Sequence, residues 1–385
     1  MTPDRRTLLA LFSLAFGLRV LYAVLVGGNT DLVTARESYD FRIAARMAES
    51  FDWASTPYAP NSPGYRMLLM VAFRVFGVSW WTAVLLNAVL GAITALFLYR
   101  IGERLLGKRI GLVSALWLGL SVHHMHFATI ASRDVLVTLL LTWVAYVLAR
   151  PFFRMRTAVW LAFLVTLLLH TEPMFLVLVP FLMVFLALKS THHRALSVQY
   201  VFLFMAAMLV FFTPRTVRNF IVYRDLIPIS LEATRYTEPV MRLLRDTPPT
   251  PPVSHPDAVT VHKPGFITNE REFWRMVRLT ESPAAPASGV PAEPAWSLRH
   301  NATSLINYGV LLPFFLVGCG FAWIRRHRAA LVVASIVLSY AILRGFLGGG
   351  EAARLWVEPL IILVSFYGLK VLLDLRRAAG VPAQQ

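Results

Sequence analysis

The sequence has few charged residues and almost no cysteine. Asp, Glu, Lys and Arg make up 15% of its 385 residues, against about 25% in a soluble globular protein. A water-soluble chain is therefore excluded, because it would have too little polar surface to face water. The single cysteine, Cys319, excludes an intrachain disulfide and a cysteine-based zinc site. The chain also has no Walker A, HExxH, GxSxG or dinucleotide-binding motif.

Long apolar runs take the place of these features. Hydrophobic residues make up 57% of the chain, and its mean hydropathy is +0.60. A run of about 20 apolar residues is long enough to cross a bilayer as a helix. The sequence predicts an all-α polytopic membrane protein with about ten transmembrane helices, within a range of 9 to 12, at 7–26, 80–99, 110–126, 133–149, 157–169, 173–188, 197–213, 304–324, 329–346 and 355–373.

The distribution of basic residues predicts the orientation in the membrane. The net charge is +16, but the basic residues lie between apolar runs and form no single patch, which argues against a nucleic-acid partner. With the N-terminus in the cytoplasm, the inner segments together hold 17 basic and three acidic residues. This bias follows the positive-inside rule. We expect both termini to be cytoplasmic and the protein to lie in a bacterial inner membrane.

Two long outer segments divide the chain. The first, 27–79, belongs with the membrane core 1–213, and we expect the two to form one module. The second, 214–303, is a long outer loop that is rich in proline, and 304–385 holds the C-terminal membrane helices. Within the first outer segment, apolar residues recur at helical spacing over Glu37–Ser50, which predicts an amphipathic helix at the membrane interface. A second half-apolar helix is expected over Met67–Val78.

Ionisable side chains gather at the outer ends of the predicted spans, although charge at membrane depth is costly and usually marks function. They include Asp31, Glu37, Asp40, Asp134, Arg215, Arg218 and Arg354. Arginine forks bind phosphate, and a carboxylate can remove the proton of a hydroxyl group. This combination indicates a site for a negatively charged, lipid-linked substrate.

Four stretches, in order along the chain, resemble the family-39-type glycosyltransferases of the GT-C superfamily. This group includes protein O-mannosyltransferases, aminoarabinose transferases and lipopolysaccharide sugar transferases. The stretches are Glu37-Ser-Tyr-Asp-Phe-Arg-Ile-Ala-Ala-Arg-Met47, Ser62-Pro-Gly-Tyr65, Thr213-Pro-Arg-Thr-Val-Arg-Asn219 and Arg354-Leu-Trp-Val-Glu-Pro359. The resemblance extends over roughly 7–375 and leaves 236–300 unmatched.

The resemblance implies transfer of a sugar from a polyprenyl-phosphate donor to a hydroxyl group of a lipid, glycan or protein outside the cytoplasm, with inversion at the anomeric carbon. Glu37 would be the general base, and Asp31 or Asp40 could supply the carboxylate in its place. Asp134 would orient an arginine, the acceptor or a metal. The remaining expected site residues bind the donor phosphate or shape the loop beside it: Arg218, Arg354, Arg215 and Tyr65.

Departures from the family pattern keep two other functions open. The family usually has Asp where this chain has Glu37, Glu where it has Asp134, and Trp where it has Arg215, so an inactive scaffold is one alternative. A lipid or solute transporter is the other. No cofactor is certain from the sequence. A divalent metal would use His123 and His126, which are three residues apart on one helix face.

Overall fold

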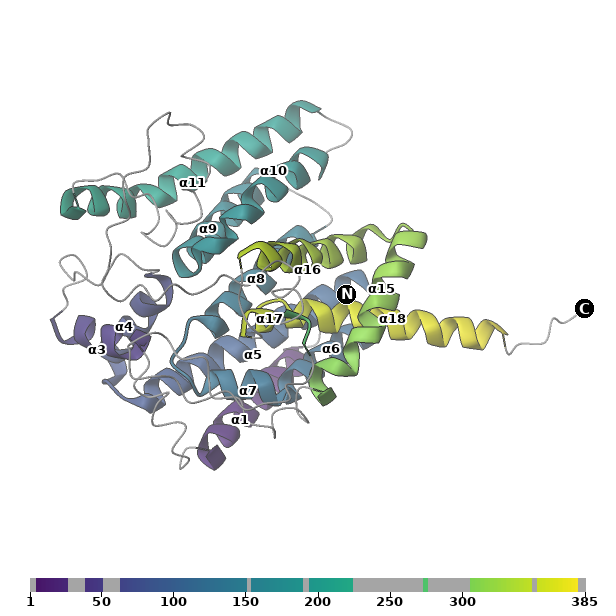
Figure 1. Ribbon diagram of the computed structural model, residues 1–385, viewed down its shortest axis with the longest axis horizontal. Helices are drawn as coiled ribbons and strands as arrows, with labels where there is room; N and C mark the ends of the chain where they lie inside the picture. The colour runs from purple at the N-terminus through teal and green to yellow at the C-terminus, as the bar shows by residue number, and fades with distance from the viewer. Residues whose placement is uncertain are drawn as a thin grey trace, which may run out of the picture.

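The computed structural model describes residues 5–26, 39–50, 63–150, 154–189, 194–223, 273–275, 305–347 and 352–379. Its regular elements are all helices (Figure 1). The prediction of an all-α membrane protein is confirmed.

The first half of the chain supplies eight described helices. They are α1 (Arg5–Val26), α3 (Tyr39–Ser50), α4 (Gly64–Phe76), α5 (Trp80–Leu105), α6 (Lys108–Leu120), α7 (Val122–Ala128), α8 (Asp134–Leu148) and α9 (Met155–Thr171). The second half supplies the 3₁₀ turn η1 (Pro173–Val177), α10 (Leu178–Lys189), α11 (Arg194–Tyr223), the π turn η2 (Leu305–Gly309), α15 (Leu311–Ile324), α16 (Arg328–Leu347), α17 (Ala352–Leu355) and α18 (Glu358–Ala379).

Each of the ten predicted apolar runs lies on one or two of these helices. Within the described ranges, α1, α5 and most of α11 are long and apolar enough to cross a membrane. The pair α6 and α7 makes a fourth span if it counts as one helix bent by 55°. The bend lies at Ser121, whose backbone is extended. Five further apolar helices are shorter, so the number of spans stays a prediction.

Helix α5 lies at the centre of the bundle and packs against α1, α6 and α8. Helices α15 and α18 pack closely because glycines face each other at Gly318 and Gly368. A Cβ atom at Gly318 would lie 2.3 Å from the carbonyl oxygen of Val364. Helices α9, α10 and α11 run side by side along one edge of the molecule (Figure 1).

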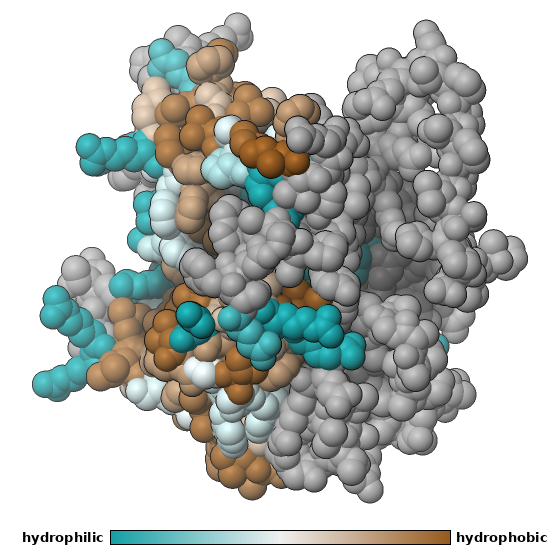
Figure 2. Space-filling model, turned by 90° about the vertical axis from the view of Figure 1, so that its left-hand side faces the viewer, coloured by the Kyte–Doolittle hydropathy of each residue, from teal (hydrophilic) through white to brown (hydrophobic). Residues whose placement is uncertain are grey.

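Large apolar side chains remain on the surface of these helices, as membrane lipid requires. Phe76, Phe202 and Trp323 each expose about three quarters of their area. Figure 2 shows such apolar side chains over much of the described surface on one face, with polar side chains grouped between them.

The two helices expected in the first outer segment are present as α3 and α4. They pack on each other through the Phe41 and Phe73 rings, 4.9 Å apart, and through an ion pair between Arg66 Nε and Asp40 Oδ1 at 2.6 Å. Helix α4 begins at Gly64, which packs against Thr171 at the end of α9. Tyr65 and Arg66 are thereby fixed between α3, α5 and α9.

Candidate functional site

Asp134 is held at the first residue of α8 by an aromatic side chain from the far end of the sequence. Its Oδ1 accepts a hydrogen bond of 2.8 Å from the indole Nε1 of Trp356. Trp356 lies between α17 and α18 and is only 4% exposed, so its ring is rigidly placed. The positive end of the α8 dipole also favours a carboxylate in the first helical turn. The aspartate is therefore fixed while remaining partly exposed.

A guanidinium group lies beside the same indole. The Arg344 Cζ lies 5.3 Å from the centroid of the Trp356 ring and 6.0 Å from that of Tyr340. Its Nη1 also lies 3.1 Å from the sulfur of Met174. Our sequence analysis missed Arg344 because it lies inside the apolar run 329–346. A lone arginine near the outer end of such a run was the signal that could have found it.

Tyr65 joins the first outer segment to the core of the bundle. Its hydroxyl donates to Asn87 Oδ1 at 3.1 Å, and Asn87 Nδ2 donates to the carbonyl oxygen of Ile130 at 2.8 Å. Burial raises the pKa of Tyr65 above its usual range, and the negative charges of Asp40 and Asp134 add to the rise. Both carboxylates therefore lie near this phenol, although 94 residues separate them along the chain.

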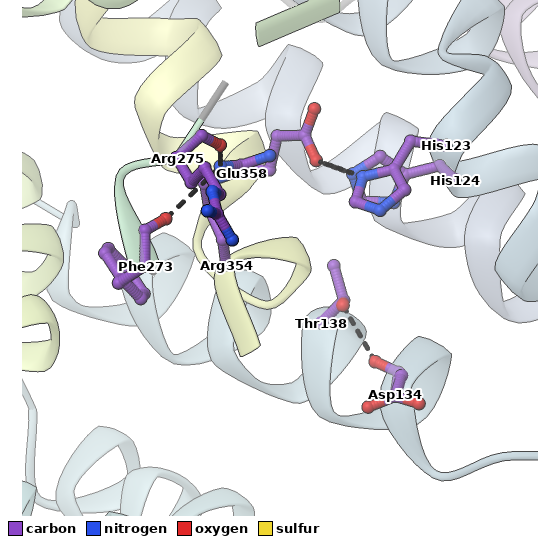
Figure 3. A network of polar contacts seen from close by, with 8 residues as sticks. All are labelled: His123, His124, Asp134, Thr138, Phe273, Arg275, Arg354 and Glu358. Atoms are coloured by element: carbon purple, nitrogen blue, oxygen red, sulfur yellow. Dashed lines mark hydrogen bonds and ion pairs between the residues drawn. The ribbon is translucent and has the colours of Figure 1, made fainter. Parts of the chain in front are cut away.

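Arg354 anchors a piece of the second long outer segment. Its Nη1 donates to the carbonyl oxygens of Arg275 at 2.6 Å and of Phe273 at 3.2 Å, as Figure 3 shows. Its Cζ lies 3.7 Å from the centroid of the Tyr308 ring. Arg354 as a whole is 1% exposed. In this structure, the residue that we expected at the donor phosphate fastens 273–275 against the helices.

Glu358, one turn beyond Arg354, faces two histidines of α7 (Figure 3). Its Oε2 lies 3.2 Å from His123 Nδ1 and 3.4 Å from His124 Nε2. His126 lies elsewhere, with its Nδ1 3.4 Å from the Tyr22 hydroxyl, so the expected pairing of His123 with His126 is not observed. In the ranges that the structure covers, no group of three His, Cys, Asp or Glu side chains is arranged to hold a metal ion.

The other expected residues divide into two groups. Arg215 and Arg218 lie on α11, which packs on α9 and α10. Arg218 Nη1 donates to Asn219 at 3.1 Å, and Arg215 is near enough to His170 of α9 for its charge to act on the imidazole. Asp31 and Glu37 lie outside the described residues.

A second ion pair lies next to Asp134. Arg133 Nε is 3.2 Å from Glu172 Oε2, and this contact links the start of α8 to the end of α9. The Arg133–Glu172 pair thus lies next to Asp134 in the sequence, as the Asp40–Arg66 pair lies next to Tyr65, and each pair joins two helices.

Residues 60–217 match a protein family described as dolichyl-phosphate-mannose-protein mannosyltransferase. No curated protein matches the sequence.

The fold resembles solved membrane enzymes. ArnT from Cupriavidus metallidurans bound to undecaprenyl phosphate aligns with a TM-score of 0.56 at 14% identity, over 95% of this chain and 66% of that protein. The archaeal oligosaccharyltransferase AglB from Archaeoglobus fulgidus, in complex with an inhibitory peptide and a dolichol-phosphate, aligns with a TM-score of 0.52 at 14% identity, over 98% of this chain and 52% of that protein. The chain thus spans about half to two thirds of the length of the proteins that it matches.

Proposed function

The chain has the fold of the GT-C superfamily of membrane glycosyltransferases, and from this premise we propose that it transfers a sugar from a polyprenyl-phosphate donor to a hydroxyl group of a lipid, glycan or protein. Two of its structural relatives support the class of donor, since one binds undecaprenyl phosphate and the other a dolichol-phosphate. The sequence predicts that the ends of α4, α8 and α16 that carry the site lie at the non-cytoplasmic face. We therefore place the reaction at that face.

One observation carries this proposal: Asp134 and Arg344 both contact Trp356, Asp134 through the indole N–H and Arg344 with its Cζ 5.3 Å from the ring centroid. Glycosyl transfer to a hydroxyl requires a base that takes the acceptor proton and a cation that neutralises the departing phosphate. A fixed carboxylate and a guanidinium beside one indole meet both requirements. Neither residue forms an ion pair with an oppositely charged side chain of the described part of the chain.

In the proposed reaction, a carboxylate takes the proton of the acceptor hydroxyl while its oxygen attacks the anomeric carbon. The bond from that carbon to the phosphate oxygen breaks, and polyprenyl phosphate leaves from the opposite face of the sugar. This in-line displacement inverts the anomeric centre. Arg344 stabilises the charge that forms on the phosphate, and Arg218, Arg215 and Arg354 are further phosphate-binding residues that the sequence predicts.

Two carboxylates compete for the role of base. The sequence favours Glu37, whereas the geometry favours Asp134, which is fixed and partly exposed. Asp40 instead binds Arg66 and joins α3 to α4, so we assign it a positioning role. Asp31 is the remaining candidate base that the sequence predicts in the first outer segment.

The test is sugar transfer in proteoliposomes that contain purified protein and polyprenyl-phosphate sugars. Asp134→Asn and Glu37→Gln remove the negative charge with little change in size. We expect the variant that lacks the base to lose about 10²- to 10⁴-fold in turnover. Glu103→Gln, on α5 where Glu103 pairs with Arg100, is the matched control and should keep wild-type turnover. Full activity in both test variants would remove both carboxylates from the mechanism. If the wild type transfers no sugar from any donor, the inactive-scaffold alternative replaces this proposal.

A further inference from the structure

A second polar site lies toward the other end of α18 from the candidate active site. It is a cavity of about 210 Å³ whose lining includes Arg325, His327, Lys370 and Asp374. Lys370 follows Glu358 by twelve residues on the same helix, which places it about 18 Å further along the helix axis at 1.5 Å per residue. Arg325, Lys370 and Asp374 belong to segments that the positive-inside bias predicts to be cytoplasmic, so we infer that the cavity lies toward the opposite membrane face.

The turn between α15 and α16 brings two of these basic side chains to the cavity. The His327 N–H donates to the carbonyl of Ala322 at 2.9 Å, and the Arg326 N–H donates to that of Trp323 at 3.1 Å. This is the Schellman pattern of helix ends, in which glycine usually occupies the left-handed position. Here Arg326 occupies it with a φ of 49°, and it is the only non-glycine residue with positive φ in the described ranges. A side chain at this left-handed position costs about 1–2 kcal/mol, and the residues on either side of it, Arg325 and His327, line the cavity.

The polar groups of the cavity are available to a ligand. Within the ranges that the structure covers, Arg325 and Lys370 form no ion pair with Asp374 or another carboxylate. The Nδ1 of His327 accepts a hydrogen bond of 3.2 Å from the Ala330 N–H, so the neutral ring carries its proton on Nε2. The cavity thus offers two permanent cations and an imidazole donor.

Apolar residues complete the wall. Leu105 and Leu106 at the end of α5 line one part, and Tyr367 and Val371 of α18 line another. A pocket for a drug-sized molecule usually has about 300–1,000 Å³, so 210 Å³ suits a single headgroup with its chains lying outside. Basic pockets between membrane helices bind acidic lipid headgroups in the same way.

We propose that this cavity binds the phosphodiester headgroup of an anionic phospholipid in the leaflet opposite the candidate active site. Arg325 and Lys370 contact the phosphate oxygens, and Asp374 accepts a hydrogen bond from a headgroup hydroxyl. A glycerol headgroup fits this pattern, because it carries both a phosphate and free hydroxyl groups.

The test measures binding of phosphatidylglycerol to detergent-purified full-length protein by native mass spectrometry, with phosphatidylcholine and inorganic phosphate as comparison ligands. We expect Arg325→Gln combined with Lys370→Gln to weaken phosphatidylglycerol binding by about tenfold or more, since each basic residue near an acidic lipid contributes appreciably. Arg376→Gln combined with Arg377→Gln is the matched control. It removes the same charge from exposed positions on α18 that do not line the cavity, and it should bind as the wild type does.

The proposal is overturned if the Arg325 and Lys370 variant binds the lipid as the wild type does, if the control loses as much binding, or if phosphatidylcholine binds as tightly as phosphatidylglycerol. Inorganic phosphate that binds as tightly as the lipid would make this a site for free phosphate and overturn the lipid assignment. Asp374→Leu removes the acceptor for the headgroup hydroxyl and also the negative charge among the residues that line the cavity. Phosphatidic acid has a phosphate but no headgroup hydroxyl, so this variant should bind it more tightly than the wild type does. Because that change is a gain, misfolding cannot produce it, and no gain would contradict the assigned charge balance.

Discussion

Trp356 offers a direct test of the candidate active site, because a single atom of its side chain fixes Asp134. Trp356→Phe keeps an aromatic ring among Phe175 and Tyr340 but removes the indole N–H, which donates to Asp134 Oδ1 at 2.8 Å. The carboxylate then loses its donor and becomes free to rotate.

The expected effect follows from the strength of this bond. A hydrogen bond to a charged group contributes about 1.5–3 kcal/mol, and about 1.4 kcal/mol corresponds to a factor of ten in rate. Asp134 is half-buried, so water replaces part of the lost bond and the lower value applies. We expect kcat/KM for sugar transfer to fall about tenfold, mainly through kcat, because the change misplaces a reacting group and leaves donor binding intact.

The assay is transfer from a polyprenyl-phosphate sugar in proteoliposomes, with thermal unfolding measured in parallel. Trp160→Phe is the matched control. Trp160 lies on α9, is 40% exposed and contacts Trp143 and Phe163 through its ring alone, so the same substitution there should leave kcat unchanged. Equal turnover in the two variants would refute the role that we assign to the Trp356–Asp134 bond.

Two further predictions concern how the outer segments are attached. Gly64→Ala should lower the free energy of unfolding by about 1–3 kcal/mol, because the new Cβ would lie 2.3 Å from Thr171 Oγ1. Gly17→Ala is the control, since a Cβ there has nothing within 4 Å and should not destabilise the protein. Thermal unfolding in detergent compares the two variants, and equal stability would contradict the close contact at Gly64. Arg354→Gln should speed tryptic cleavage after Arg275 several-fold, because it removes the side-chain hydrogen bonds to the backbone of 273–275. An unchanged cleavage rate would mean that other contacts hold this segment.

The helices were predictable because a membrane span needs only a local property of the sequence, an apolar run of sufficient length. All ten runs lie on helices for that reason. The helices α3 and α4 were predictable from their apolar spacing. The predicted span ends at 213, because apolar character falls at Pro214, whereas the helix α11 continues without a break to Tyr223.

The contacts of the site were less predictable, because they join residues far apart in sequence. Asp134 and Arg354 were expected near the outer rim, but nothing local shows that the indole of Trp356 reaches the aspartate. The histidine spacing favoured His123 with His126, yet the bend at Ser121 and the position of α18 turn His123 toward Glu358 instead.

The uninterrupted course of α18 has a mechanical consequence. An α-helix resists compression along its axis, since every turn is bonded to the next. Glu358 begins this helix, directly after Trp356 and Val357, and Asp374 lies sixteen residues further along it. A push or pull on one end of such a rod displaces the other end by nearly the same amount, so the surroundings of Asp374 and the contact between Trp356 and Asp134 are joined through one stiff element.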